Sequence, residues 1–329
     1  MLPSVQAFLS GVVDYAGLFP PAQLPMEQAI RNYARYRQEP DSWMLGRFVC
    51  PAALLAQLAP YQDELFDPAP PFVFSALGRG GQEVSDFLTG LRADLEAIAQ
   101  FRDRHGGAVT VDVLELRLPA DVQRSHELDA LRALLGAVAD LIEPLGPPSL
   151  TPYYEMAAGP EWPTALSAVR HILASDHRSA SRHRQRCRPG GVKVRCGGLE
   201  ASAFPSPEQV AFALTACRDA AVPFKATAGL HHPLRRFDRR VKATMHGFLN
   251  VFGAGVLAHA RGLSEDEVTR ILADKTANHF VFDDARFSWN DIHATIAEIS
   301  AARHEGVISF GSCSFDEPRD DLRALGLLP

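Results

Sequence analysis

The stretch GGVKVRCGG, residues 190–198, is a short apolar run that ends in two glycines. A second run of this kind, VPFKATAG at residues 222–229, follows it, and each run carries one lysine. The segment 207–220 between them has a helical pattern, with Ser206 as N-cap and Pro207 at the first helical position. A strand, a helix and a second strand in this order predict one unit of a parallel sheet with a crossover helix.

The same alternation fills the part of the chain that precedes this unit. Helical patterns separate the apolar runs and strengthen the prediction of parallel strands. Strands are expected at 11–17, 43–50, 72–77, 108–118 and 150–156, and helices at 26–38, 52–64, 83–105, 124–143 and 163–175. Seven or eight such units in 329 residues predict one α/β domain, a closed (β/α)8 TIM barrel. The alternative is an open doubly wound sheet, although no Gly-x-Gly-x-x-Gly follows the first strand.

The pattern loosens after the seventh strand. Residues 239–261 and 264–278 look helical, and Ser264 begins the second of these with a capping box. Two segments, 279–282 and 307–312, compete for the eighth strand, and we favour the second. Residues 235–305 are then expected to form an expanded helical connection within the single domain 1–329.

Composition limits the class of protein. Hydrophobic residues make up 47% and charged residues 22%, as in a globular protein, and the formal net charge of −6 disfavours general nucleic-acid binding. Five scattered cysteines, no signal-peptide pattern and no apolar run of about 18 residues predict a cytoplasmic protein that does not enter the membrane. The composition is compatible with an oligomer. The basic segment 178–188 is expected to be a solvated or disordered loop, with nucleic-acid or anion binding as the alternative.

Polar residues at the carboxyl ends of the predicted strands are the candidates for chemistry, because barrel enzymes work at that face. Residues two apart on a strand share a face, so the side chains of Lys193 and Arg195 are expected to point the same way, as are those of Lys225 and Thr227. Charged side chains at one barrel mouth must pair with each other, contact water or bind an anionic ligand. An internal salt-bridge network is therefore the alternative to a ligand-binding site. The candidates are Asp14, Arg47, Ser75, Arg79, Asp112, Glu115, Arg117, Glu155, Lys193, Arg195, Lys225, Thr227, His231 and His232.

The two lysines suggest a tuned amine. Lowering a lysine pKa from about 10.4 towards about 7 requires roughly 4–5 kcal/mol. A second ammonium about 5 Å away supplies about 3 kcal/mol at an effective dielectric constant near 20, and desolvation supplies the rest. We therefore expect Lys193 to attack a carbonyl carbon and Lys225 to lower its pKa. For either lysine alone, the alternative is a structural ion pair with a carboxylate.

These strands resemble those of the class I aldolases, most nearly the deoxyribose-phosphate aldolases. In that family the Schiff-base lysine lies on the sixth strand and a second lysine on the seventh, which implies these roles for Lys193 and Lys225. The segment VDVL at 111–114 is similar to the family's fourth strand and implies that Asp112 transfers a proton. The segment FGSCS at 310–314 is similar to the family's phosphate-binding stretch and implies substrate binding by Gly311, Ser312 and Ser314.

The chain also departs from the aldolase pattern. Asp316 and Glu317 follow the serine stretch, where acidic residues compete with a phosphate. Alternation places Asp112 and Glu115 on opposite faces of their strand, so they are rival proton-transfer residues. The segments 14–21 and 228–233 resemble a second family of (β/α)8 barrels, and this resemblance implies no activity.

Three functions remain open from the sequence. In the first, a lyase without cofactor, Lys193 forms an iminium, Glu115, Glu155 or Asp112 moves the proton, and Arg47, Arg117 or Arg195 binds a small anionic substrate together with Asp14, Thr227 and His231. In the second, a metal-dependent isomerase or hydrolase, Glu115, Glu155, Asp14 and one of His231 and His232 hold a divalent ion. The third is a non-catalytic barrel that binds an anion or a sugar. Cys196, without a nearby histidine in the sequence, is expected to be a core residue.

Overall fold

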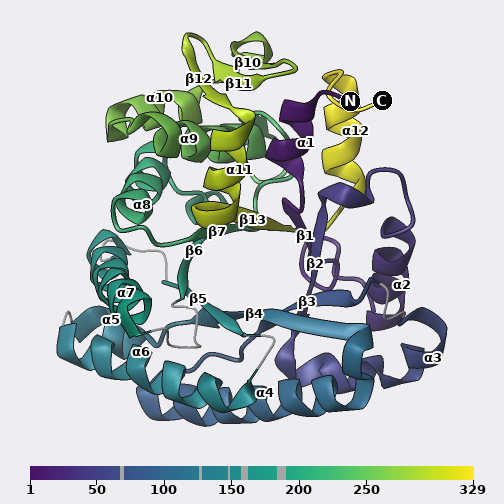
Figure 1. The fold of residues 1–329 in the computed structure, drawn as a ribbon, viewed down its shortest axis with the longest axis vertical. Coiled ribbons are helices and arrows are strands. Elements are labelled where there is room, and N and C mark those ends of the chain that lie inside the picture. Colours follow the sequence, from purple (N-terminus) through teal and green to yellow (C-terminus); the bar gives the residue numbers. More distant parts are fainter. Residues whose placement is uncertain (67–69, 126–127, 147–148, 157–161, 184–189) are drawn as a thin grey trace. The chain divides into compact units, whose positions relative to one another are not determined.

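The computed structural model describes residues 1–66, 70–125, 128–146, 149–156, 162–183 and 190–329. Eight parallel strands close into a barrel with helices around it (Figure 1), which confirms the (β/α)8 prediction and excludes the open sheet. The strand order is β1 (Val13–Tyr15), β13 (Val307–Ser312), β7 (Phe224–Thr227), β6 (Gly191–Arg195), β5 (Thr151–Glu155), β4 (Val109–Arg117), β3 (Phe72–Leu77) and β2 (Leu45–Pro51). The eighth barrel strand is therefore the segment 307–312, as we favoured.

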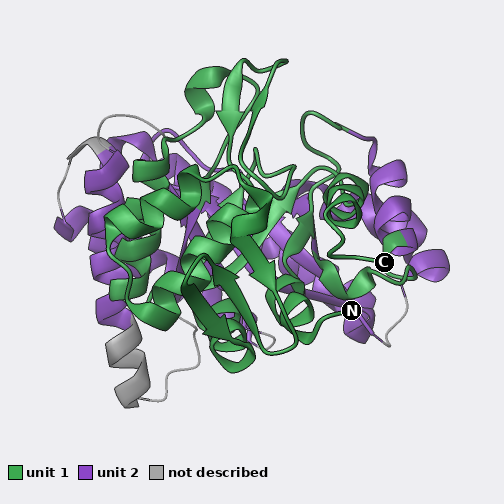
Figure 2. Ribbon diagram, turned by 90° about the horizontal axis from the view of Figure 1, so that it is seen from above, with its two compact units in different colours: residues 1–23, 36–46, 194–329 green, residues 24–35, 47–193 purple. Residues whose placement is uncertain are grey.

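The chain divides into two compact units, coloured separately in Figure 2. Unit 2 comprises residues 24–35 and 47–193 and contains β3, β4 and β5 with most of β2 and β6. Its helices are α2 (Met26–Tyr36), α3 (Gln62–Leu65), α4 (Val84–His105), α5 (Ala120–Ser125), α6 (Leu128–Ile142) and α7 (Trp162–His183), with 3-10 turns η2 (Ala52–Tyr61), η3 (Gly106–Ala108) and η4 (Glu143–Leu145). The segment expected as one α-helix at 52–64 is mostly 3-10 helix, and Pro60 within it cannot donate a helical hydrogen bond.

Unit 1 comprises residues 1–23, 36–46 and 194–329. It contains β1, β7 and β13, and Ser206 is the N-cap of its helix α8 as the sequence predicts, with Gln209 completing a capping box. Its helices are α1 (Pro3–Leu9), α8 (Pro207–Asp219), α9 (Phe248–Arg261), α10 (Glu265–Ala273), α11 (Ile296–Glu305) and α12 (Asp316–Ala324), with 3-10 turns η1 (Ser42–Met44), η5 (Ala201–Ala203) and η6 (Ala277–His279).

The connection after β7 differs from the expected helical insertion. Strands β8 (Arg236–Asp238) and β9 (Ala243–Met245) form an antiparallel pair, so α9 begins at residue 248 instead of 239. The Asp238 carboxylate accepts hydrogen bonds from the backbone N–H groups of Arg240 and Val241 and turns the chain between these strands. A second antiparallel sheet consists of β10 (Phe280–Phe282), β11 (Arg286–Trp289) and β12 (Ile292–Thr295). The rival eighth strand at 279–282 thus belongs to this small sheet, which lies outside the barrel.

Aromatic side chains hold this small sheet to the N-terminal helix. Phe8 of α1 has its ring centroid 5.3 Å from that of Phe282 and 4.9 Å from that of Phe287. Phe248 of α9 stacks on Phe310 of β13 with centroids 5.3 Å apart, and burial of such rings contributes a large part of core stability. Among the helices of the described residues, none combines the length and the hydrophobicity that a membrane-spanning segment needs.

Candidate functional site

A buried lysine with two glutamates lies on consecutive strands of unit 2. Lys193 Nζ is 2.6 Å from Glu115 Oε2 and 2.8 Å from Glu155 Oε2, and the three side chains are only 4%, 3% and 8% exposed. The Ser75 hydroxyl donates a 2.7 Å hydrogen bond to Glu115 Oε1. Register explains the arrangement, since Glu155 on β5 is directly opposite Lys193 on β6. Strands β3 to β6 therefore each contribute one polar side chain to a single cluster.

The charges of this cluster set the protonation state of Lys193. Burial alone would lower the pKa of Lys193, but the adjacent carboxylates of Glu115 and Glu155 raise it above its ordinary value. The resting lysine is therefore an ammonium, opposite to the lowered pKa expected from the sequence. The cause is that two carboxylates contact the amine. Lys225 belongs to unit 1, and its role as the residue that tunes Lys193 stays a prediction.

The second lysine lies in a comparable cluster within unit 1. Lys225 of β7 forms an ion pair with Asp14 of β1 and donates a 3.2 Å hydrogen bond to Ser309 Oγ of β13. The Ser309 hydroxyl in turn donates to Asp14 Oδ2 over 2.7 Å, and all three residues are buried. The sequence analysis selected Asp14 and Lys225 but missed Ser309. Strand alternation offered a signal, because Ser309 shares a face with the selected Gly311.

Asp112 and Arg47 lie apart from the lysine cluster of unit 2. Arg47 Nε and Nη2 donate to the two carboxylate oxygens of Asp112 over 2.6 and 2.7 Å, a bidentate pair. On β4, Asp112 falls between Val111 and Val113, which pair with consecutive residues of β3, so it lies at a register irregularity. The structure thus places Glu115 and Glu155, and not Asp112, beside Lys193.

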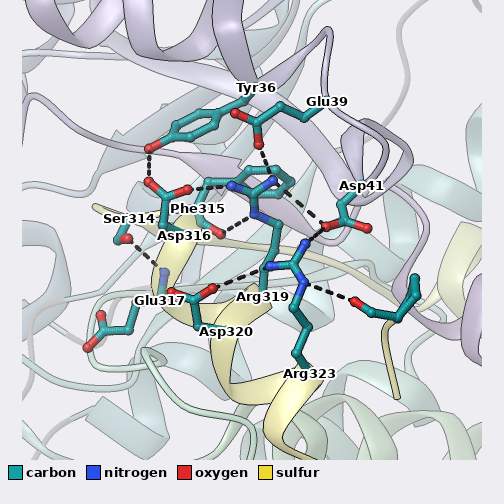
Figure 3. A network of polar contacts seen from close by, with 11 residues as sticks. Tyr36, Glu39, Asp41, Ser314, Phe315, Asp316, Glu317, Arg319, Asp320 and Arg323 are labelled. Carbon is teal, nitrogen blue, oxygen red and sulfur yellow. Dashed lines mark hydrogen bonds and ion pairs between the residues drawn. The ribbon is translucent and has the colours of Figure 1, made fainter. Parts of the chain in front are cut away.

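The hydroxyl groups of the serine stretch at the end of β13 form hydrogen bonds with the backbone of that stretch and with the start of α12. The Ser312 hydroxyl donates to Ser314 O over 2.7 Å, and Ser314 Oγ accepts a 3.1 Å hydrogen bond from the N–H of Glu317. Figure 3 shows Ser314 next to a dense polar network in which Arg319 binds Glu39 and Asp316. Acidic groups therefore already occupy the helix start where the aldolase resemblance implied a phosphate.

The histidines after β7 bind carboxylates of α12. His231 Nδ1 is 3.1 Å from Glu317 Oε2, and His232 Nδ1 is 2.5 Å from Asp321 Oδ2. Within the described ranges, no group of three or more His, Cys, Asp or Glu side chains is arranged to hold a metal ion.

The remaining predicted residues lie at strand ends. Arg117 and Arg195 are exposed at the ends of β4 and β6, and Thr227 lies at the end of β7. The Thr227 carbonyl accepts a 2.8 Å hydrogen bond from the N–H of Cys196, which is buried as expected. Burial raises the pKa of the Cys196 thiol to about 12, so this thiol is unreactive.

Comparison with protein families and with curated proteins adds no relative. No protein-family model matches the sequence, and a search of curated proteins finds no match. The function is therefore argued from the residues of the two buried clusters.

Proposed function

We propose that the protein is a carbonyl-processing enzyme, lyase-like in its chemistry, in which Lys193 forms an imine with a small substrate. The observation that carries this proposal is the position of Lys193 Nζ, 2.6 and 2.8 Å from two buried carboxylates. Imine formation needs an acceptor for the ammonium proton and a donor for the departing hydroxyl group. Two adjacent carboxylates can supply both functions.

The choice of residue supports chemistry over a purely structural ion pair. The chain has only four lysines, Lys193, Lys225, Lys242 and Lys275, against 29 arginines. Arginine is better suited to structural carboxylate binding, because its guanidinium is planar and always charged. A chain that otherwise uses arginine nevertheless places two of its four lysines in buried sites. An amine that can lose its proton accounts for this choice.

The proton moves between three named groups. A carboxylate of Glu115 or Glu155 accepts a proton from Lys193 and leaves a neutral amine. The amine nitrogen bonds to the carbonyl carbon, and the glutamic acid returns the proton as water departs from the carbinolamine. Because the pKa of Lys193 is raised, the neutral amine is scarce at rest. Imine formation should therefore accelerate as the pH rises above neutrality.

An anionic group on the substrate is supported by Arg117. This residue lies two positions beyond Glu115 on β4, so the two share a strand face, and Arg117 is exposed. A guanidinium at this place can bind a carboxylate. Pyruvate is therefore our first probe, and acetaldehyde is its uncharged counterpart.

Reductive trapping tests the proposal. The protein is incubated with pyruvate or acetaldehyde and sodium cyanoborohydride, and the intact mass is measured. We expect one adduct on the wild-type protein and none on Lys193→Arg, which keeps the charge but cannot form an imine. Lys242→Arg is the matched control and should behave as the wild type. An equal adduct on Lys193→Arg would overturn the proposal.

A further inference from the structure

A cavity lies between three outer helices of unit 2. Helices α5, α6 and α7 pack against one another around it (Figure 1), and its volume is about 420 Å³. Cavities of roughly 300–1,000 Å³ are the usual size of small-molecule sites in proteins. The described residues that line it do not include Lys193 or its two glutamates. The cavity is therefore a separate candidate for ligand binding.

Most of the side chains that line this cavity near α5 and α6 are apolar. Leu118 comes directly after β4, Val122 lies on α5 and Leu131 on α6, and all three are buried. Leu128 at the start of α6 also lines the cavity and remains 47% exposed. A molecule in the cavity would remove apolar surface of the protein and of itself from water, which favours an apolar ligand.

One cation, Arg170 of α7, lines the same cavity. Its side chain is half-buried, and its Nε is buried without a hydrogen-bond partner among the described residues. No carboxylate of the described residues forms an ion pair with Arg170. The helical positions three and four residues away from it hold no acid, since they are Leu166, Ser167, Leu173 and Ala174. A buried polar group without a partner points to a missing one.

Other enclosed arginines of this protein have carboxylate partners. The half-buried Arg47 donates to both carboxylate oxygens of Asp112 over 2.6 and 2.7 Å, and the buried Arg319 binds Glu39. Arg170 is enclosed to a comparable degree as Arg47 but stands beside an apolar cavity. A carboxylate on a bound molecule would supply the partner that the chain itself provides at the other two arginines.

We propose that this cavity binds a small amphipathic carboxylic acid in its ionised form. The carboxylate accepts hydrogen bonds from the guanidinium of Arg170, whose planar fork matches its two oxygens. The apolar part of the molecule packs against Leu118, Val122 and Leu131. The site does not take part in imine formation at Lys193, so neither proposal depends on the other.

Calorimetric titration with octanoate tests this assignment, and 1-octanol is its uncharged counterpart. The full chain is titrated with each compound at pH 7.5. We expect one octanoate site per chain, with an affinity at least about tenfold higher than that for 1-octanol, because only the carboxylate forms charge-assisted hydrogen bonds. Absence of octanoate binding at millimolar concentration, or equal affinities for the two compounds, would overturn the proposal.

Arg170→Met should weaken octanoate binding about tenfold or more and leave 1-octanol binding unchanged. This pair of results separates the loss of the charge from a collapse of the cavity. Arg132→Met is the matched control, since Arg132 of α6 is exposed and is not among the lining residues, and it should bind octanoate as the wild type does. Equal octanoate affinities of wild type and Arg170→Met would refute carboxylate binding by Arg170.

A substitution that fills the cavity tests where the ligand binds. Ala168 of α7 is half-buried and lines the cavity, so Ala168→Phe should abolish the binding of both compounds. Ser167→Phe is the second filling variant if Ala168→Phe fails to fold. Lys193→Arg should bind octanoate as the wild type does, whatever the outcome of the imine test. Unchanged octanoate binding in a folded filling variant would place the ligand elsewhere and overturn the assignment of this cavity.

Discussion

At the scale of single residues, the sequence identified the lysine cluster but not its charge state. Strand alternation and the position of strand ends were enough to select Glu115, Glu155 and Lys193. Whether the pKa of Lys193 is raised or lowered depends on which groups contact the amine, and the sequence does not contain that information. Ser309 was missed because its one signal was the strand face that it shares with Gly311, and an isolated small polar residue adds none of its own.

The lysine cluster should respond asymmetrically to substitution. Lys193→Met leaves two buried carboxylates without their cation and should lower the free energy of unfolding by about 3–5 kcal/mol. Glu155→Gln leaves one lysine with one carboxylate and should cost about 1 kcal/mol. Urea unfolding at pH 7.5 measures both values. Equal losses in the two variants would show that Lys193 does not hold the two glutamates in place.

Ser309 should stabilise the second lysine cluster. Ser309→Ala removes a donor to Asp14 and an acceptor from Lys225, both buried, and should cost about 1–3 kcal/mol. Ser300 on the exposed surface of α11 is the matched control, and Ser300→Ala should change the unfolding free energy by less than about 0.5 kcal/mol. Comparable effects of the two substitutions in urea titrations would contradict the contacts assigned to Ser309.

At the scale of elements, the barrel strands were predictable and the connection after β7 was not. Barrel strands alternate with helices long enough to show a period, whereas β8 to β12 have only three or four residues each. The turn residue Asp238 is present in the sequence, but the helical pattern that follows it led to the prediction of a helix in place of β9. The prediction of helix starts was more reliable, since the N-cap Ser206 and the capping box at Ser264 both begin helices as predicted.

Helix α12 should depend on one buried arginine. Arg319 is buried and binds Glu39 and Asp316 while lying over the rings of Tyr36 and Phe315. Arg319→Ala should therefore lower the unfolding free energy by about 2–4 kcal/mol. The half-exposed Arg323 is the control, and Arg323→Ala should cost about 1 kcal/mol or less. Hydrogen exchange should locate the Arg319→Ala effect in α12, and an unchanged exchange rate there would refute this role.

At the scale of the whole molecule, the count of strand–helix units predicted the closed barrel. Fold alone does not select a reaction, however, and the resemblance to aldolases was confined to short motifs. The structure keeps the lysines of that resemblance but places glutamates beside Lys193. It also fills the implied phosphate position with the acidic start of α12.

Stability should fall on mild acidification. His246 is fully buried, and its Nε2 faces the Pro205 carbonyl at 2.8 Å while Nδ1 faces Arg235. Burial lowers the pKa of His246 to about 4, and burial also lowers the pKa values of His105 and His259. Between about pH 6.5 and 4 the unfolded chain therefore binds more protons at these residues, and the folded state loses stability as the pH falls.

His231 has the opposite effect on the pH dependence of folding stability. Its pKa is raised to about 9, so its contribution is complete below about pH 6.5 and is lost as the pH rises towards 9. Urea midpoints between pH 4.5 and 9 should be highest near neutrality. His246→Gln should flatten the acid side of the profile and His231→Gln the alkaline side. A profile unchanged by either substitution would contradict these assignments.

The most direct test of the central claim is a peptide mass map of the wild-type protein after trapping with pyruvate and cyanoborohydride. With four lysines and one α-amino group in the chain, each possible adduct falls on a distinguishable residue. Our account predicts the pyruvate-derived mass on Lys193, at a rate that increases from pH 7 to pH 9. Label on Lys225, Lys242 or Lys275 with none on Lys193 would contradict it.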